Sequence, residues 1–109
     1  MKDIDINCDM GEGIGNEELL MPFISSANIS CGFHAGDDNE MKRVVDLCLK
    51  YDIAIGAHPS YPDKENFGRT AMNFTGEKIR QLVKEQLYGL NKIVTASGGR
   101  MNHVKPHGA

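Results

Sequence analysis

Polar and apolar side chains alternate strictly near the start of the chain, over residues 3–9, which predicts a β-strand. Short segments with strand character at residues 27–31, 53–58 and 101–107 predict three more strands. Each predicted strand ends in, or leads directly into, an Asp or a His: Asp9, His34, His58 and His107. The same strand-to-polar-end pattern therefore occurs four times.

Segments with helical periodicity separate these strands. Residues 17–24 predict a short helix with Leu19, Leu20, Phe23 and Ile24 as its apolar side chains. Residues 38–51 predict a second helix, with Asp37 and Glu40 placed for a capping box and an apolar stripe of Met41, Val44, Val45 and Cys48. A third helix is predicted from Thr75, as N-cap, to about residue 97, with a stripe of Ile79, Leu82, Val83, Leu87, Leu90 and Val94. Strands that alternate with helices indicate a parallel sheet with right-handed crossovers.

Side chains that share a face with the strand-end Asp and His residues are mostly polar, whereas the opposite face is apolar. The polar face comprises Asp5, Asn7, Asp9, Asn28, Ser30, Gly32, His34, Ala54, Gly56, His58, His103, Lys105 and His107. A doubly wound sheet is covered by helices on both faces and needs both to be apolar. This pattern favours a parallel (β/α) barrel with helices outside and a polar lumen, although a four-stranded sheet whose polar face meets solvent stays open as an alternative.

Composition narrows the class of protein. A chain of 109 residues predicts a single domain over residues 1–109. A net charge of -3 gives no reason to expect a nucleic acid or a membrane surface as partner, and no apolar run is long enough to cross a bilayer. Three cysteines without CxxC spacing indicate buried thiols and a cytoplasmic location.

The strand-end residues have the chemistry of an active site. Asp9, His34, His58 and His107 are suitable ligands for a divalent metal, and Asp9 with a histidine is equally suited to acid–base catalysis. Lys105 and Arg69 are suited to holding a carboxylate or phosphate. His103 lies deeper along its strand, and we expect it to make structural hydrogen bonds.

Five segments together resemble the LamB/YcsF family, whose members are the A subunits of bacterial 5-oxoprolinases. They are DINCDMGE at 5–12, SANISCGFHAGD at 26–37, IGAHPSYPD at 55–63, NFGR at 66–69 and HVKPHG at 103–108. The resemblance implies a (β/α) barrel of the glycoside hydrolase/deacetylase type, acting with subunits B and C in ATP-dependent opening of the lactam 5-oxo-L-proline to L-glutamate. Because a complete barrel needs about 250 residues, we expect about half a barrel here, the N-terminal half.

From chemistry we assign proton transfer to Asp9, His58 and His107, and substrate binding to Glu12, Asn28, His34, Arg69 and Lys105. ATP is expected as co-substrate, with Mg²⁺ or a site ion as the metal. One alternative is a metal-dependent, deacetylase-like hydrolase in which Asp9, His34 and His58 hold the ion, with His107 able to replace His58. Another is a non-catalytic half-barrel that only associates with partners. Exposed strand edges also predict self-association.

Overall fold

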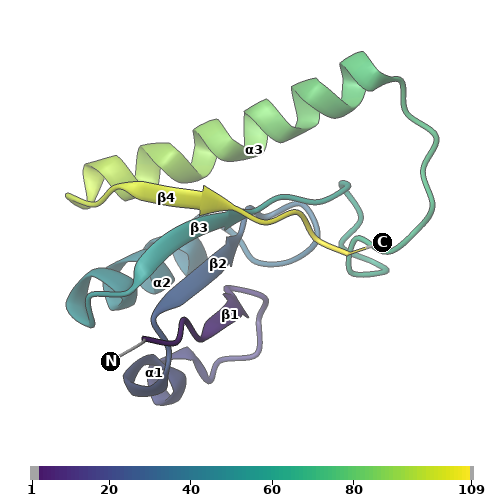
Figure 1. Cartoon of the computed structure of the whole chain (residues 1–109). Coiled ribbons are helices and arrows are strands. Elements are labelled where there is room, and N and C mark those ends of the chain that lie inside the picture. Colours follow the sequence, from purple (N-terminus) through teal and green to yellow (C-terminus); the bar gives the residue numbers. More distant parts are fainter. Residues whose placement is uncertain (1–2, 109) are drawn as a thin grey trace.

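Four parallel strands form one open sheet in the computed structural model, which describes residues 3–108 (Figure 1). They are β1 (Asn7–Met10), β2 (Ser26–Ser30), β3 (Ala54–His58) and β4 (Met101–Val104), in the spatial order β1-β2-β3-β4. Each strand therefore pairs with the next in sequence, and β1 and β4 are the two edges. This arrangement confirms the predicted parallel α/β fold as part of a barrel. Residues 1, 2 and 109 of the predicted domain lie outside the described residues.

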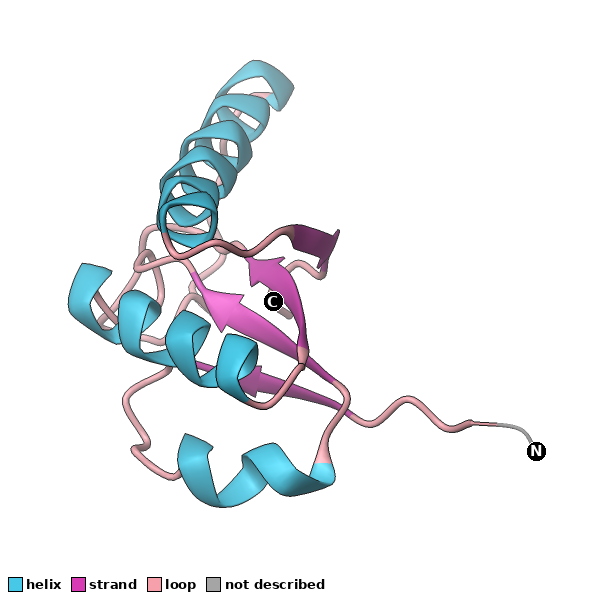
Figure 2. Ribbon diagram, turned by 90° about the vertical axis from the view of Figure 1, so that its left-hand side faces the viewer, coloured by secondary structure: helices cyan, strands magenta, loops and turns pink. Residues whose placement is uncertain are grey.

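Helices cover one face of this sheet and leave the other face open (Figure 2). Helix α1 (Glu17–Leu20) continues into the 3₁₀ turn η1 (Met21–Phe23) between β1 and β2, α2 (Asp38–Lys50) joins β2 to β3, and α3 (Gly76–Ala96) joins β3 to β4. The open face is the one on which the sequence predicts polar side chains. Among the residues the structure describes, none of the helices combines the length and apolar character that crossing a membrane requires.

Both long helices begin at the caps that the sequence predicts. The Asp37 side chain accepts a hydrogen bond from the backbone N–H of Glu40 (2.8 Å), and Thr75 accepts one from the N–H of Lys78 (3.1 Å). Such caps satisfy backbone donors that the first helical turn leaves free. The apolar stripe of α2 is buried as predicted, whereas the buried stripe of α3 differs. It contains the polar Gln86, and Ile79 at its start is 39% exposed.

The core lies between the sheet and the helices. Ala27, Ile29, Ile55 and Ala57 on the covered face are at most 2% exposed and belong to one cluster with the α2 stripe, Leu90 and Val94. The cysteines are free thiols; Cys31 and Cys48 are buried as predicted, whereas Cys8 is only partly buried. Burial raises the pKa of Cys31 to about 11 and that of Cys48 to about 12, so both stay protonated at neutral pH and act as small apolar side chains.

The first quarter of the chain departs from the prediction. Strand β1 is shorter than residues 3–9, and Ile4 and Ile6 are 82% and 52% exposed because they precede the paired segment of an edge strand. The helix predicted over residues 17–24 changes to a 3₁₀ turn at Met21, where Pro22 cannot donate a backbone hydrogen bond. Consequently Met21 and Ile24 are buried, whereas the predicted apolar residues Leu19 and Phe23 are exposed.

Strand β4 also ends earlier than predicted, at Val104, but the chain after it continues in the same direction beside β3. The backbone N–H of Lys105 donates to the carbonyl of Ala57 (2.8 Å), and that of His107 donates to the carbonyl of Pro59 (2.9 Å). Pro106 lies between them and has no N–H to offer. Lys105 and His107 are therefore still held beside β3.

Candidate active site

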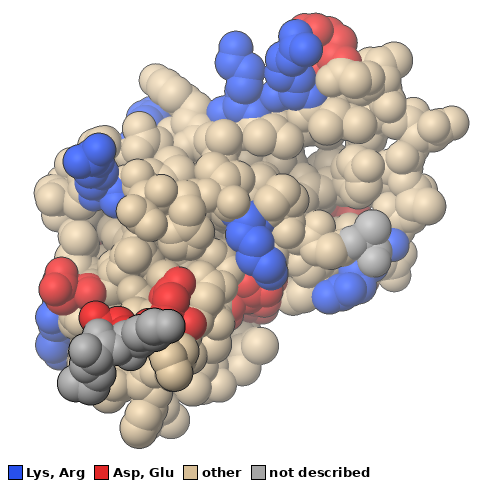
Figure 3. Space-filling view, in the orientation of Figure 1, with Lys and Arg blue, Asp and Glu red and all other residues tan. Residues whose placement is uncertain are grey.

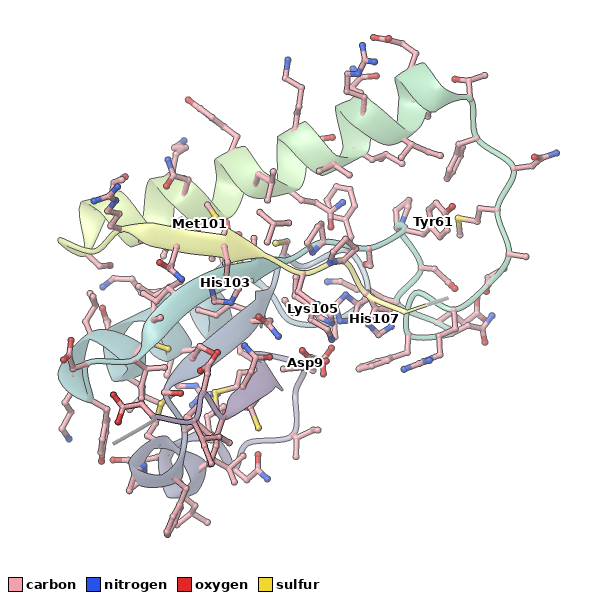
Figure 4. The ribbon with its side chains drawn as sticks, in the orientation of Figure 1. Asp9, Tyr61, Met101, His103, Lys105 and His107 are labelled. Atoms are coloured by element: carbon pink, nitrogen blue, oxygen red, sulfur yellow. The ribbon has the colours of Figure 1, made fainter. Side chains whose placement is uncertain are left out.

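The carboxyl ends of the four strands bring the predicted polar residues together on the open face. In the sheet register, Asp9 aligns with Asn28, Ser30 with His58, and Gly56 with His103. His103, Lys105 and His107 follow one another along β4 and its continuation, and Lys105 points toward Asp9 (Figure 4). Parallel pairing thus converts four separate strand ends into one site.

A cluster of one carboxylate and three imidazoles forms the centre of this site. We call Glu12, His34, His58 and His107 the Glu12–histidine cluster; one side-chain atom from each lies within 4.8 Å of the others. His34 Nε2 lies 2.5 Å from Glu12 Oε2, and His58 Nε2 lies 3.1 Å from His107 Nδ1. The rings of His34 and His107 stack at a centroid distance of 4.2 Å.

Each imidazole is oriented by a hydrogen bond on the side away from the cluster. His58 Nδ1 donates to the carbonyl of Lys105 (2.6 Å), and His107 Nε2 donates to the carbonyl of Phe67 (2.8 Å). His34 Nδ1 lies 2.9 Å from the hydroxyl of Ser60, which donates to the carbonyl of Tyr61 (3.0 Å). A carbonyl only accepts, so the neutral rings of His58 and His107 carry their proton on the outward nitrogen and direct a lone pair toward the cluster.

Burial favours the neutral form of two of these rings. The buried surroundings lower the pKa of His34, and this effect outweighs the opposing influence of Glu12. Burial is also the first cause of the lowered pKa of His107, to which the positive charge of Arg69 contributes. Both rings are therefore neutral at neutral pH.

Asp9 lies beside the cluster in an ion pair of its own. Its two carboxylate oxygens each lie 3.1 Å from Lys105 Nζ, Oδ1 accepts from Asn28 Nδ2 (2.9 Å), and Oδ2 is 3.5 Å from His58 Nε2. Burial tends to raise the pKa of Asp9, but the hydrogen bonds from Asn28 and Lys105 together lower it below the usual value. Asp9 is therefore ionised at neutral pH. Acidic and basic side chains meet near the centre of this face in the space-filling view (Figure 3).

A layer of side chains beneath Asp9 supports it. Asn28 is fully buried; its amide donates to Asp9 and Asn7, and its carbonyl accepts from Asn7 (3.2 Å) and from His103 Nε2 (2.7 Å). These bonds use the whole capacity of the amide group. The structure thus places Asn28, expected as a substrate-binding residue, in a supporting position, and gives His103 the structural hydrogen bond that its depth predicts.

The loop after β3 closes one side of the cluster. Phe67 packs edge-on against His34 and His107, with centroids 5.0 and 5.3 Å away, and Arg69 lies over the Phe67 ring at 6.0 Å. Gly68 has φ of +75°, and a Cβ there would lie 2.7 Å from Cβ of His34. Only glycine fits this close approach, so the loop depends on it to hold Arg69 near the cluster.

Two residues of this site were not among the site residues predicted from the sequence. Ser60 orients His34, and the side-chain amide of Gln86 on α3 accepts from the Ser60 N–H (2.9 Å) and donates to the Ser60 carbonyl (2.9 Å). Gln86 shares the four-residue spacing of the buried Leu82, Leu90 and Val94. A polar residue at that spacing within an apolar stripe is the signal that could have identified it.

The residues that could hold a metal ion overlap with the expected set without matching it. His34, His58 and His107 were expected as candidate ligands and belong to the converging group, Glu12 completes it, and Asp9, also expected, lies outside it. Asp9 is instead engaged by Lys105 and Asn28. Imidazole nitrogens combined with a carboxylate are donors that suit a divalent transition metal.

Two comparisons relate this chain to known proteins. The sequence profile of the LamB/YcsF family matches residues 4–109, a range that contains every candidate site residue named above. The structure is similar to the crystal structure of a lactam utilization protein from Thermus thermophilus, with 37% sequence identity and a TM-score of 0.94. The match covers 98% of this chain and 45% of that one, so this chain spans less than half the length of that protein.

Proposed function

The chain belongs to the LamB/YcsF family, and from this membership and the geometry of the site we propose that it supplies part of the active site of a hydrolase that opens a cyclic amide. The proposed reaction is ATP-dependent cleavage of 5-oxo-L-proline to L-glutamate. The observation that carries the proposal is the convergence of Asp9, Lys105 and the Glu12–histidine cluster in a chain that is similar to a lactam utilization protein.

The chemistry explains why ATP is needed. A lactam carbonyl is a weak electrophile, and transfer of the γ-phosphoryl group of ATP to its oxygen, with release of ADP, activates the carbon. Water then adds to this carbon, and the C–N bond breaks as the ring nitrogen takes a proton. A second water releases phosphate from the resulting acyl phosphate and leaves the glutamate carboxylate. The site must therefore move protons and stabilise anionic oxygen.

The described residues suit these two tasks. Asp9, which is ionised, is suited to accepting a proton from water, with His58 and His107 beside it as further proton-transfer groups. Lys105 Nζ and the exposed guanidinium of Arg69 are suited to the substrate carboxylate and the developing oxyanion. Glu12 and His34 complete the wall that faces the ring of the substrate.

We assign the remaining components to the assembly. ATP, with its Mg²⁺, is the co-substrate, and subunits B and C are the partners that complete the reaction. This chain matches only 45% of the T. thermophilus protein. The whole reaction must therefore be tested on an assembly that contains a complete barrel. The cytoplasm, where ATP is available, is the compartment we propose.

The test is 5-oxoproline-dependent ATP hydrolysis in the presence of subunits B and C. We expect Asp9→Asn and His58→Ala to lower turnover by at least about 100-fold, the lower end of what one acid–base group contributes. Folding of the Asp9 variant should be little changed, because Asp9 lies in a polar, partly exposed position. His58 is fully buried, so circular dichroism checks that its variant is folded. Asp46→Asn is the matched control, since Asp46 pairs with Lys42 on the exposed surface of α2. Near wild-type turnover in the Asp9 or His58 variant would contradict the proposal.

A second candidate function is supported by the Glu12–histidine cluster itself, whose donors suit a metal-dependent hydrolase of the deacetylase kind. The same assay separates the two. Hydrolysis that needs a metal but no ATP would favour the deacetylase-like reaction, and ATP turnover that needs 5-oxoproline and both partners would favour the lactam reaction. Inactivity with all partners present would favour the third interpretation, a chain that only associates.

A further inference from the structure

We propose that the Glu12–histidine cluster is a binding site for one divalent transition-metal ion, held by Glu12, His34, His58 and His107. The binding stands on the geometry of the cluster alone. Its use in opening a lactam rests on the proposed function, and the two can fail separately.

Hydrogen bonds outside the cluster determine which nitrogens of His58 and His107 face inward without a proton. His58 and His107 each donate their outward N–H to a backbone carbonyl, so His58 Nε2 and His107 Nδ1 face each other as lone pairs at 3.1 Å when both rings are neutral. Two acceptors at hydrogen-bonding distance repel each other unless a cation lies between them. The contact between His58 Nε2 and His107 Nδ1 therefore lacks the cation that would make it favourable.

The other half of the cluster is a hydrogen-bonded contact in which a metal ion can replace the proton. His34 Nε2 lies 2.5 Å from Glu12 Oε2, and when Nε2 binds a metal, His34 Nδ1 can donate to the Ser60 hydroxyl, which donates to the carbonyl of Tyr61. That same Glu12 oxygen, Oε2, lies 3.8 Å from His58 Nε2, so the two pairs form one group. Four side-chain atoms, each a possible metal ligand, therefore share one small volume.

A proton and a metal ion differ in how many of these atoms each can join. One proton joins only two atoms, whereas all four lie in a region where His34 and His58 are at most 1% exposed. One divalent ion can accept all four lone pairs at once, and the Glu12 and Asp9 carboxylates compensate its charge. A single ion thus leaves none of these buried ligand atoms without a partner, which favours the metal.

The outer hydrogen bonds have the form that supports metal ligands. Histidines that bind metals usually donate their second N–H to a carbonyl, a carboxylate or a water, which fixes the tautomer and the ring orientation. His58 and His107 are held by donation of this kind to carbonyls, and the Ser60 hydroxyl lies within hydrogen-bonding distance of the outward nitrogen of His34. Three imidazoles and one carboxylate favour Zn²⁺ or a similar transition metal over Mg²⁺ or Ca²⁺, which prefer oxygen ligands.

The site would place Lewis-acid chemistry next to the proposed proton-transfer group. Asp9 is outside the ligand set, and its Oδ2 is 3.5 Å from His58 Nε2. With His58 and His107 engaged as ligands, proton transfer in the proposed reaction falls to Asp9. The ion supplies polarisation of a bound oxygen when present, whereas Asp9 and Lys105 provide the adjacent acceptor and positive charge.

The experiment measures metal binding directly on the purified, tag-free protein. After removal of metals with a chelator, Zn²⁺ and the spectroscopic probe Co²⁺ are added by equilibrium dialysis, and bound metal is counted by elemental analysis. We expect one ion per chain, a visible Co²⁺ spectrum indicative of nitrogen ligands, and a higher Tm with Zn²⁺. His58→Ala and His107→Ala should lose stoichiometric binding, and Ser60→Ala should weaken it about 10- to 100-fold because it removes the partner of His34.

His103→Gln is the matched control, because His103 is the remaining one of the four histidines and bonds to Asn28 outside the cluster. It should keep one ion per chain, and circular dichroism should show that every variant is folded. The absence of stoichiometric binding to wild type, or binding that persists without His58 and His107, would overturn the metal site. A metal-free assembly that still couples 5-oxoproline to ATP would overturn only the ion's role in the reaction, and a metal-loaded assembly without that turnover would overturn only the lactam reaction.

Discussion

At the scale of single residues, the polar face depends on a glycine, Gly56, which leaves room for the neighbouring His103 ring. Gly56 lies in β3 between Asn28 and His103, and a Cβ at this position would lie 2.1 Å from His103 Nε2. The imidazole occupies the space above Gly56 and thereby reaches Asn28, which in turn holds Asp9. The absence of a side chain on β3 thus connects β4 to β1 across the sheet.

We predict that Gly56→Ala lowers the free energy of unfolding by about 1–3 kcal/mol, the usual cost of overpacking, because the methyl group must displace His103. Denaturant unfolding measures the effect. Gly89→Ala is the control: Gly89 is inside α3 with open space around its Cβ position, so alanine there should stabilise by about 0.5–1 kcal/mol. The explanation predicts partial rescue by adding His103→Ala, and equal stability of the single and double variants would contradict it.

The sequence predicts the placement of a site residue where that residue follows the alternation of side chains along a strand. Alternation along the strands predicts that Asp9, His58 and Lys105 share a face, and the structure brings them together. Tautomers are different, because they depend on carbonyls such as those of Lys105 and Phe67 that only folding brings within reach. For the same reason, the saturation of Asn28 by its neighbours could not be predicted.

At the scale of elements, α3 does more than cover the sheet. Through Gln86 it binds both the N–H and the carbonyl of Ser60, as a neighbouring strand would, and so fixes the start of the loop between β3 and α3. Ser60 then orients His34. A helix on the covered side thereby determines the position of a ring on the open side.

We predict that Gln86→Leu destabilises the chain by about 1–3 kcal/mol for each backbone group of Ser60 that stays buried without a partner. Hydrogen exchange at the Ser60 amide should become faster, which a loss confined to the helix would not produce. Gln81→Leu, at an exposed position of the same helix, is the control and should change neither quantity. Unchanged exchange at Ser60 in the Gln86 variant would contradict the role assigned to this amide.

Among the elements, those with strong periodicity and caps were predictable, and those at the edge of the sheet were not. Helices α2 and α3 begin where Asp37 and Thr75 cap them, as the sequence indicates. Around α1, apolar periodicity suggests one helix, but Pro22 favours a 3₁₀ turn, and the local pattern cannot show which apolar side chains will find a surface to pack on. Burial is decided there by tertiary contacts.

At the scale of the whole molecule, the open sheet has two accessible edges with apolar side chains near them. Ile4, Ile6, Leu19 and Phe23, in the segments before and after β1, are exposed, as is Val104 in β4. Unpaired edge strands and exposed apolar groups favour pairing with another chain. Self-association therefore stays a prediction for this chain, and the two edges are where we expect it to occur.

We predict that the 109-residue chain alone has a mass in solution above 12.0 kDa, measured by light scattering on a preparation of verified mass. Ile6→Lys should shift the distribution toward the monomer, because a charge beside an edge strand opposes pairing. Asn39→Lys adds the same charge on the exposed start of α2 and should leave the mass unchanged. A monodisperse 12.0 kDa monomer that unfolds cooperatively would contradict this prediction.

The contacts that complete the site join residues from distant parts of the chain, and this determines when during folding the site can exist. Asp9 and Lys105 are 96 residues apart, His58 and His107 are 49 apart, and Glu12 and His34 are 22 apart. Long loops cost entropy to close, and topologies rich in such contacts fold slowly. The first three strands can pair in sequence order, but His107 and Lys105 arrive only when β4 docks. Partly folded chains therefore lack the assembled cluster, and its chemistry is confined to molecules in which the fourth strand is in place.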